Sequence, residues 1–181
     1  MFSKYYSAEG IILARKNYSE ADRILSVYTK PQGRISLIAK GVRRTGSRKR
    51  GHLEIFSYIK FSASRGKGID LITEVETIDS FKDIRKDLKK VALAYYFMEV
   101  VGKATHEHEK NEELFELVLE YLNRLKISRS LKSLRLNFVL ELLTVTGFWP
   151  RGKPLPDPDN FLEQITERQI NSFRVGKKIL D

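Results

Sequence analysis

A dense run of cations follows Ala39 and ends at Gly51 in this 181-residue chain. It contains no acidic residue, and glycine, serine and threonine separate its charges. Its cations are Lys40, Arg43, Arg44, Arg48, Lys49 and Arg50. Because like charges repel, the run is predicted to stay in solvent as a flexible arm rather than pack into a core. Cationic side chains neutralise phosphates, so the arm favours a polyanionic partner; a plain solvated linker is the alternative.

Cations elsewhere in the first part of the chain are expected to extend this surface. They lie on predicted strands or in a glycine-rich turn: Arg15, Lys16, Arg23, Arg34, Arg65 and Lys67. Aromatic rings among them offer faces on which bases stack, at about 1–3 kcal/mol per base. The candidates are Tyr18, Tyr28, Phe56 and Tyr58. Each ring taken alone is more typical of a barrel core, and Arg23 has Glu20 and Asp22 as alternative partners.

Groups that would support catalysis or metal binding are scarce. The chain has no cysteine, which excludes disulfides, thiolate zinc sites and cysteine nucleophiles. His106 and His108 stand in a polar stretch, where a solvated loop explains them better than a metal site does. Gly66 and Gly68 lack the lysine and hydroxyl residue of a phosphate-binding loop. We therefore expect no enzyme, no cofactor and no metal.

The positive charge is concentrated near the beginning of the chain. Residues 1–50 hold twelve Lys or Arg and three acids, whereas residues 81–181 hold eighteen and fifteen. This asymmetry favours a nucleic-acid-binding domain joined to a nearly neutral one. No apolar run approaches the roughly 18 residues of a membrane span, and the first residues lack the apolar core of a secretory signal. A cytoplasmic location is therefore expected.

Short strand patterns recur before Ser80. They cover residues 8–16, 23–29, 33–40, 53–62 and 69–78, and turn residues separate them. Within the third pattern, Ile35, Leu37 and Ala39 share one face and are expected to point toward a core. Five short antiparallel strands predict a small barrel, for which the oligonucleotide-binding (OB) fold is the commonest solution. An SH3-like barrel is the alternative.

The apolar period becomes helical after Ser80. A capping box of Ser80 and Asp83 is predicted to begin the first helix. A second helix is expected from Asn111. A third is expected from about Arg129 and should stop at Gly147, which is a typical helix terminator.

The last part of the chain contains fewer regular signals. Residues 150–158 are rich in proline and are predicted to be too broken for a helix. Thr166 and Gln169 are expected to cap a last short helix. The sequence thus predicts an α+β chain, in which a five-stranded OB-fold barrel (residues 1–80) precedes a small α-helical domain (residues 81–181).

Several segments of the barrel half carry a family signature. Tyr18–Arg23 (Tyr-Ser-Glu-Ala-Asp-Arg) is followed by Gly33–Arg44 (Gly-Arg-Ile-Ser-Leu-Ile-Ala-Lys-Gly-Val-Arg-Arg). Together they resemble the amino-terminal signature of RecO, the bacterial recombination mediator. Leu53–Phe56, Leu71–Glu74 and Ser80–Phe81 are also similar to that family. Their order and spacing make the resemblance specific, and it covers the barrel well and the helices loosely.

The resemblance implies an OB-fold barrel, a helical domain, binding to single- and double-stranded DNA, and annealing of complementary strands. It implies RecR and the single-stranded DNA-binding protein SSB as partners, RecA as an indirect one, and a nucleoid-associated role in DNA repair and recombination. Many family members carry a four-cysteine zinc module after a stretch that corresponds to Gly147–Pro150. This cysteine-free chain is expected to lack the module, or to have it reduced around residues 150–165.

Two other classes of protein remain open. The same basic barrel would suit an RNA-binding protein associated with translation. A non-enzymatic protein adaptor would instead dock an acidic partner on its cations. Arg129, Lys132 and Arg135 lie beside apolar residues of the third predicted helix, which could thus receive an acidic, aromatic-tipped peptide such as the SSB tail. A core helix with a solvated basic edge is the simpler explanation of these three residues.

Overall fold

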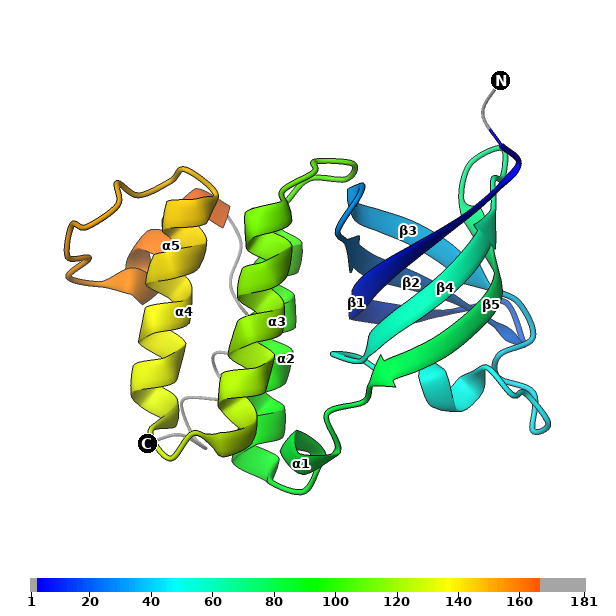
Figure 1. Ribbon diagram of the computed structural model, residues 1–181, viewed down its shortest axis with the longest axis horizontal. Helices are drawn as coiled ribbons and strands as arrows, with labels where there is room; N and C mark the ends of the chain where they lie inside the picture. Colours follow the sequence, from blue (N-terminus) through cyan, green and yellow to red (C-terminus); the bar gives the residue numbers. More distant parts are fainter. Residues whose placement is uncertain (1–2, 167–181) are drawn as a thin grey trace. The chain divides into compact units, whose positions relative to one another are not determined.

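The computed structural model describes residues 3–166 and divides the chain into two compact units. The first unit contains the residues up to 80 together with the segment 106–111, and the second contains the helices (Figure 1). One helix of the second unit precedes segment 106–111 and another follows it. The chain therefore passes between the two units three times.

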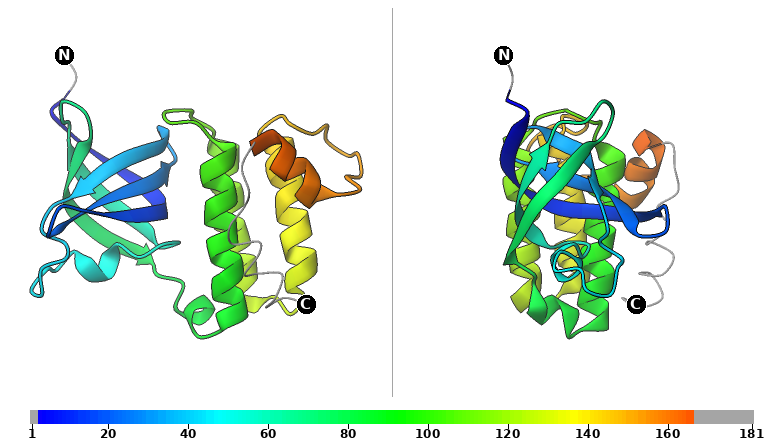
Figure 2. Two further views of the ribbon diagram at one scale, coloured as in Figure 1. Left: turned by 180° about the vertical axis from the view of Figure 1, so that it is seen from behind. Right: turned by 90° about the vertical axis from the view of Figure 1, so that its right-hand side faces the viewer.

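The strands of the first unit close into a barrel (Figure 2). They are β1 (Tyr5–Tyr18), β2 (Asp22–Thr29), β3 (Gly33–Ala39), β4 (Tyr58–Ser64) and β5 (Asp70–Asp79). Their order around the barrel is β1-β2-β3-β5-β4, with β3 and β5 parallel and the other neighbours antiparallel. The five-stranded OB-fold barrel predicted from the sequence is confirmed.

The barrel core follows from the alternation of side chains along its strands. Ile35, Leu37 and Ala39 of β3 are buried, as the sequence predicts. Ile35 lies opposite Val27 of β2, and Leu37 lies opposite Leu25. Residues directly opposed in an antiparallel pair share a face, so these side chains meet inside the barrel. Full burial of one such side chain contributes about 1.5–3 kcal/mol.

The segment before β4 is not the strand that its sequence predicts. Residues 53–57 are irregular, and Phe56 has a left-handed φ of 57° with its ring fully buried. The Phe56 N–H donates to the Ile12 carbonyl (2.8 Å), and the Ile12 N–H donates to the Ser57 carbonyl (3.1 Å). The run is apolar because it packs beside β1, and apolar character alone does not distinguish that role from a strand.

Segment 106–111 covers the open edge of β3. Strand β3 pairs with β5 only from Leu37 onward, so the first half of β3 lacks a partner on that side. Glu107 forms an isolated parallel bridge with Arg34 there, and its carboxylate accepts a hydrogen bond from the Ser36 hydroxyl (2.6 Å). The His108 N–H also donates to the Arg34 carbonyl (2.9 Å). The segment thereby satisfies backbone groups that would otherwise form a free strand edge.

The described helices of the second unit are α1 (Lys82–Arg85), α2 (Leu88–Ala104), α3 (Glu112–Ile127), α4 (Leu131–Val145) and α5 (Pro158–Thr166). Three rings hold α2, α3 and α4 together. The Phe138 centroid lies 4.0 Å from that of Phe97 and 5.2 Å from that of Tyr121. Gly147 follows α4 with a φ of 81°, as its expected role in ending the third predicted helix requires. Within residues 3–166, no helix is long and apolar enough to cross a bilayer.

The first predicted helix is divided into α1 and α2. The Asp87 carboxylate accepts hydrogen bonds from the N–H groups of Lys89 (2.9 Å) and Lys90 (3.3 Å), so Asp87 caps α2. Aspartate is a favoured N-cap residue, and here it starts a new helix. The predicted capping box placed the N-cap at Ser80, whereas the N-cap position of α1 is one residue later. Phe81 occupies the N-cap position of α1 with a φ of 51°, and its own side chain makes no capping hydrogen bond.

Residues 150–157 form no helix, as the sequence predicts, and helix α5 begins at Pro158, the last residue of that proline-rich stretch. Pro158 is its first residue, where the missing N–H is tolerated, and the Asp157 carboxylate accepts a hydrogen bond from the Asn160 N–H (3.1 Å). Thr166, expected to begin a later helix, instead lies within α5. The cap expected at Gln169 lies outside the described residues.

Candidate nucleic-acid interface

The cationic segment 40–52 is a succession of turns rather than a flexible arm. Backbone hydrogen bonds close these turns, for example from the Ser47 N–H to the Arg44 carbonyl (3.0 Å). Val42 lies near the start of this segment and Leu53 directly follows it, and both are fully buried in the barrel core. The expectation of a free arm was wrong because these two apolar residues attach both ends of the segment to the barrel.

The β1–β2 hairpin holds one side of this segment. The Gly41 N–H donates to the Asp22 carboxylate (2.8 Å), and the Arg43 N–H donates to the Ala21 carbonyl (2.9 Å). The Arg43 guanidinium donates to the Ser19 carbonyl (3.2 Å). Asp22 is therefore engaged with the backbone of the segment, and the cations of segment and hairpin are brought together.

Strand β5 holds the other side. The Lys49 ammonium donates to the Ile72 carbonyl (3.1 Å), and the His52 ring forms a hydrogen bond with the Thr77 hydroxyl (2.7 Å). Lys49, predicted to contact DNA, thus has a structural contact and is half-buried. The other cations of the segment remain exposed: Lys40, Arg43, Arg44, Arg48 and Arg50.

Two predicted cations, Arg15 and Arg23, lie on the inner face of the barrel near one of its ends. In the β1–β2 ladder, Arg15 is opposite Leu25 and Asn17 is opposite Arg23. Leu25 belongs to the core, so this register directs Arg15 and Arg23 along the inner face toward the barrel end. Arg15 forms an ion pair with Glu54 (2.5 Å). Glu54 is the acidic residue that partly balances this group of cations.

Arg23 lies in an electrostatically unfavourable position. Its Nη1 atom is enclosed and has no hydrogen-bond partner within residues 3–166. Burial lowers the pKa of the Arg23 guanidinium below its ordinary value, and the positive charges of Arg15, Arg50 and Arg43 lower it further. The carboxylate of Glu54 acts in the opposite direction. We call Arg15, Arg23, Arg43 and Arg50 the arginine cluster; a bound anion would offset their mutual repulsion.

The structure separates the remaining predicted cations from this cluster. Lys16 is opposite Ile24 on the outer face of the barrel. Arg34 is at the other end of β3, beneath segment 106–111. Arg65 and Lys67 are exposed in the β4–β5 turn, where the Arg65 guanidinium is 5.1 Å from the centroid of the Tyr6 ring.

The predicted stacking rings divide in the same way. Tyr28 and Phe56 are fully buried and have no face for a base, so that interpretation is wrong for both. Tyr58 is half-buried, and its hydroxyl donates to Glu9. Tyr18 is 51% exposed, and Ser19, which follows it, accepts the hydrogen bond from Arg43. Of the four predicted rings, Tyr18 is therefore the one that stays largely exposed, and it shares the outer face of β1 with Lys16.

Two histidines were predicted to lie in a solvated loop. His106 and His108 are both exposed, and His106 lies 3.4 Å from the Glu109 carboxylate. Within residues 3–166, no three potential metal ligands gather into a group. The loop has a structural role that the sequence did not indicate, because its backbone completes the edge of β3.

The three cations proposed for a peptide site have different environments. Arg135 is only 13% exposed in its side chain and forms an ion pair with Asp159, which links α4 to α5. An acidic peptide would therefore have to compete with an internal carboxylate for Arg135. Arg129 and Lys132 are exposed at the α3–α4 turn. They remain candidates.

These two cations belong to a larger basic surface, which we call the basic end of the helical unit. It consists of Arg129 and Lys132 together with Lys86, Leu88, Lys90, Lys126 and Ile127. The Lys90 ammonium donates to the Lys126 carbonyl (2.7 Å), which joins the start of α2 to the end of α3. The ammonium groups of Lys86, Lys126 and Lys90 all lower the pKa of Asp83. Leu88 and Ile127 are 73% and 83% exposed among these charges. In the sequence, Leu88 and Ile127 each stand beside a lysine at a helix end, and this pattern could have indicated the surface. It was missed because the helical domain as a whole is nearly neutral.

The chain matches two family models. The model described as recombination protein O N terminal matches residues 1–81, and the one described as recombination protein O C terminal matches residues 85–153. The boundary between them is near the end of β5.

Sequence relatives agree with these models. The chain is 37% identical over 145 residues to DNA repair protein RecO from Dehalococcoides mccartyi, an alignment that covers 80% of this chain and 57% of the relative. It is 35% identical over 147 residues to the protein of the same name from Pelotomaculum thermopropionicum, covering 81% and 57%. The protein of that name from Roseiflexus sp. is 30% identical over 151 residues, covering 83% and 53%. The chain thus spans a little over half the length of these relatives. With both family models matching in order over barrel and helices, the chain belongs to the RecO family.

Proposed function

We propose that this chain acts in DNA repair and recombination by binding DNA through the arginine cluster and the exposed cations of segment 40–52. The observation that carries the proposal is the enclosed Nη1 of Arg23, which has no partner within residues 3–166 and is surrounded by like charges. A phosphate oxygen would accept from that donor and reduce the repulsion among the cluster. Membership of the family and the OB-fold barrel support DNA as the source of the phosphate.

The mechanism requires no catalytic group. Cations contact phosphates without reading bases, so single- and double-stranded DNA are both ligands. Tyr18 supplies one exposed ring for stacking when the bases are unpaired. Neutralising two complementary strands on one surface lowers their repulsion, and base pairing then drives annealing.

The helical unit supplies the contacts with other proteins in this proposal. The basic end combines cations with the exposed side chains of Leu88 and Ile127, which suits the acidic, aromatic-tipped tail of SSB. Together with RecR, the chain would help to load RecA onto SSB-coated single strands at the nucleoid. Arg129 and Lys132 are the first residues to test for the tail contact.

DNA binding is tested by measuring the anisotropy of a labelled single strand at increasing salt. If about five phosphates are contacted, log K falls with log salt at a slope near −3.5, from roughly 0.7 per contact. The double variant Arg43→Ser/Arg50→Ser should reduce the magnitude of that slope by about 1.4. The control, Arg65→Ser/Lys67→Ser, removes the same charge from the β4–β5 turn and should change it less. Equal effects of both variants would remove the arginine cluster from the proposal.

The same assay separates the RNA-binding alternative. An RNA of identical sequence should bind no more tightly than the DNA, because phosphate contacts do not distinguish the two sugars. Consistently tighter binding of RNA would favour recognition of the 2′-hydroxyl and a role in translation.

The partner contact is tested by annealing naked and SSB-coated complementary strands. Arg129→Ser/Lys132→Ser should slow annealing of coated strands and weaken binding of a synthetic SSB-tail peptide, while annealing of naked strands is unchanged. Arg135→Ala serves as the control, because this change breaks an internal ion pair and should lower the melting temperature without a specific loss of peptide binding. If Arg129→Ser/Lys132→Ser anneals coated strands normally, the SSB contact is not at the basic end.

A further inference from the structure

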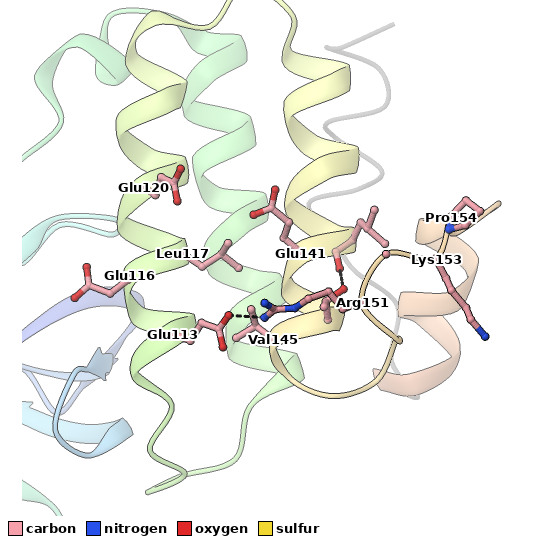
Figure 3. A pocket seen from close by; sticks show the side chains of 12 residues that line it. Glu113, Glu116, Leu117, Glu120, Glu141, Val145, Arg151, Lys153 and Pro154 are labelled. Carbon is pink, nitrogen blue, oxygen red and sulfur yellow. Dashed lines mark hydrogen bonds and ion pairs between the residues drawn. The ribbon is translucent and has the colours of Figure 1, made fainter.

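A groove runs along the helical unit between α3 and α4, and the loop that connects α4 to α5 borders it (Figure 3). Its volume is about 720 Å³. It is lined by Glu113, Glu116, Leu117, Glu120, Leu140, Glu141, Thr144, Val145, Arg151, Gly152, Lys153 and Pro154. We call it the acidic groove.

The groove is apolar along its floor and anionic along its rim. Leu117, Leu140 and Val145 contribute the apolar surface. Glu113 and Glu116 come from the first turns of α3, and two further carboxylates line the groove from α3 and α4. A ligand that combines cations with apolar side chains would complement both surfaces.

Two cations of the chain line this groove, and one of them forms an ion pair there. Figure 3 shows Arg151 pointing from the connecting loop toward Glu113, and its Nη2 atom is 2.8 Å from a Glu113 carboxylate oxygen. In the same view the Lys153 ammonium points away from Glu113. Both partners of the Arg151 ion pair are largely exposed, at 76% and 62%. Exposed ion pairs contribute about 0–1 kcal/mol, so an incoming guanidinium can replace Arg151 at little cost.

We propose that the acidic groove is a docking site for a basic, amphipathic segment of a partner protein, and that Arg151 occupies the site until the segment binds. The ligand class follows from the chemistry of the groove: the guanidinium of Arg151 demonstrates what the rim accepts, and the floor selects for neighbouring apolar side chains. The site is on the helical unit and uses none of the cations assigned to DNA. It therefore does not depend on the proposed function.

Trp149 provides a local reporter of binding. It is the sole tryptophan of the chain, and its indole N–H donates to the carbonyl of Lys153, a residue of the groove lining (3.0 Å). Its ring also packs on Phe161 (centroids 5.1 Å apart). A segment that displaces Arg151 should shift the connecting loop and change the emission of Trp149.

The experiment titrates the full chain with a synthetic peptide of alternating arginine and leucine residues, which contains no tryptophan, and follows Trp149 emission. A peptide with glutamate in place of arginine is the matched ligand control. Saturable binding of the arginine peptide alone is expected, although the net charge of the chain is +10 and disfavours cationic ligands elsewhere. No saturable change with the arginine peptide, or an equal change with the glutamate peptide, would overturn the proposal.

Three variants locate the binding site. Glu113→Gln/Glu116→Gln should weaken the peptide about tenfold without changing affinity for single-stranded DNA. Arg151→Ala should tighten it about threefold, because the internal competitor is gone. Lys153→Ala, a neighbouring cation that points away from Glu113, is the control and should leave affinity within about twofold. Unchanged affinity in the first two variants would overturn the proposal. So would self-association of the unliganded chain that Glu113→Gln/Glu116→Gln abolishes, because the occupant would then be a second copy.

Discussion

Gly33 fixes the start of β3 and leaves no room for a side chain. Its φ is +67°, a conformation that glycine adopts readily and other residues rarely do. A Cβ atom built at this position would lie 2.0 Å from the backbone carbonyl oxygen of Glu109. Glu109 belongs to the segment that covers β3, so this glycine permits the close approach of two chain stretches far apart in sequence.

Gly33→Ala should therefore destabilise the barrel. The expected loss is about 2–4 kcal/mol, because backbone strain adds to a contact that only movement of segment 106–111 can relieve. Gly46→Ala is the control, since nothing lies within 4 Å of its added methyl group. Urea unfolding of both variants, followed by circular dichroism, measures the difference. Equal stabilities would mean that the segment does not pack on Gly33 in solution.

Tyr28 makes the stability of the barrel sensitive to high pH. Burial, and then the charge of Glu109, raise its pKa to about 12. Its hydroxyl donates to the Asn111 carbonyl (3.4 Å). The neutral phenol is thus favoured in the folded chain, so its contribution is complete below the unfolded pKa of about 10 and is lost as the pH rises toward 12.

When the pH is raised from 9 to 11.5, the free energy of unfolding should fall less for the Tyr28→Phe variant than for the unmodified chain. The difference expected from this one ionisation is about 2 kcal/mol. Urea unfolding at the two pH values measures it in both proteins. Parallel losses would place the phenol in contact with water rather than in its buried position against segment 106–111.

At the scale of elements, Asp87 decides where the long helix of the second unit begins. Its carboxylate caps α2, and Ser80 lies one residue before the N-cap position of the short helix α1. Asp87→Ala should cost about 1 kcal/mol, the usual value for a lost N-cap, and Ser80→Ala should cost less than half of that. Thermal unfolding of the two variants compares them directly. A larger effect of Ser80→Ala would restore the capping box that the sequence pattern predicts.

Sequence patterns predicted the elements better than their junctions. The alternation of Ile35, Leu37 and Ala39 identified β3 because one face of that strand is buried and the other is not. Asp87 was overlooked since the apolar helical period continues across it. Local signals of this kind do not reveal which of two adjacent caps the tertiary structure will use.

For the candidate site, the sequence indicated where cations are concentrated, but it did not indicate which of them are exposed and which have internal partners. Arg43 and Arg50 are exposed in segment 40–52, as a cationic run without acids implies. Lys49 and Arg135 have the same charge but contact groups far away in sequence, the Ile72 carbonyl and the Asp159 carboxylate. Only the fold determines which cations have internal partners.

At the scale of the whole molecule, the barrel unit is discontinuous in sequence. A chain cut after Ser80 would keep all five strands but lose segment 106–111, which bonds to Ser36 and Arg34. We expect this truncated chain to melt several degrees below the barrel of the intact protein, because three hydrogen bonds and the covered edge of β3 are lost. Reattaching residues 105–111 through a flexible linker should recover most of the loss. Equal melting temperatures with and without the segment would contradict the expectation.

Because segment 106–111 follows all five strands in the chain, the ribosome makes the strands before it makes the segment that covers the edge of β3. Residue 106 is made 27 residues after β5 ends at Asp79, and at about 5–20 residues per second that distance corresponds to roughly one to six seconds. Throughout this interval a nascent chain presents the first half of β3 with free backbone groups, which another strand can pair with. The ribosome-bound barrel is therefore most prone to aggregate after its last strand has emerged and before segment 106–111 has been made.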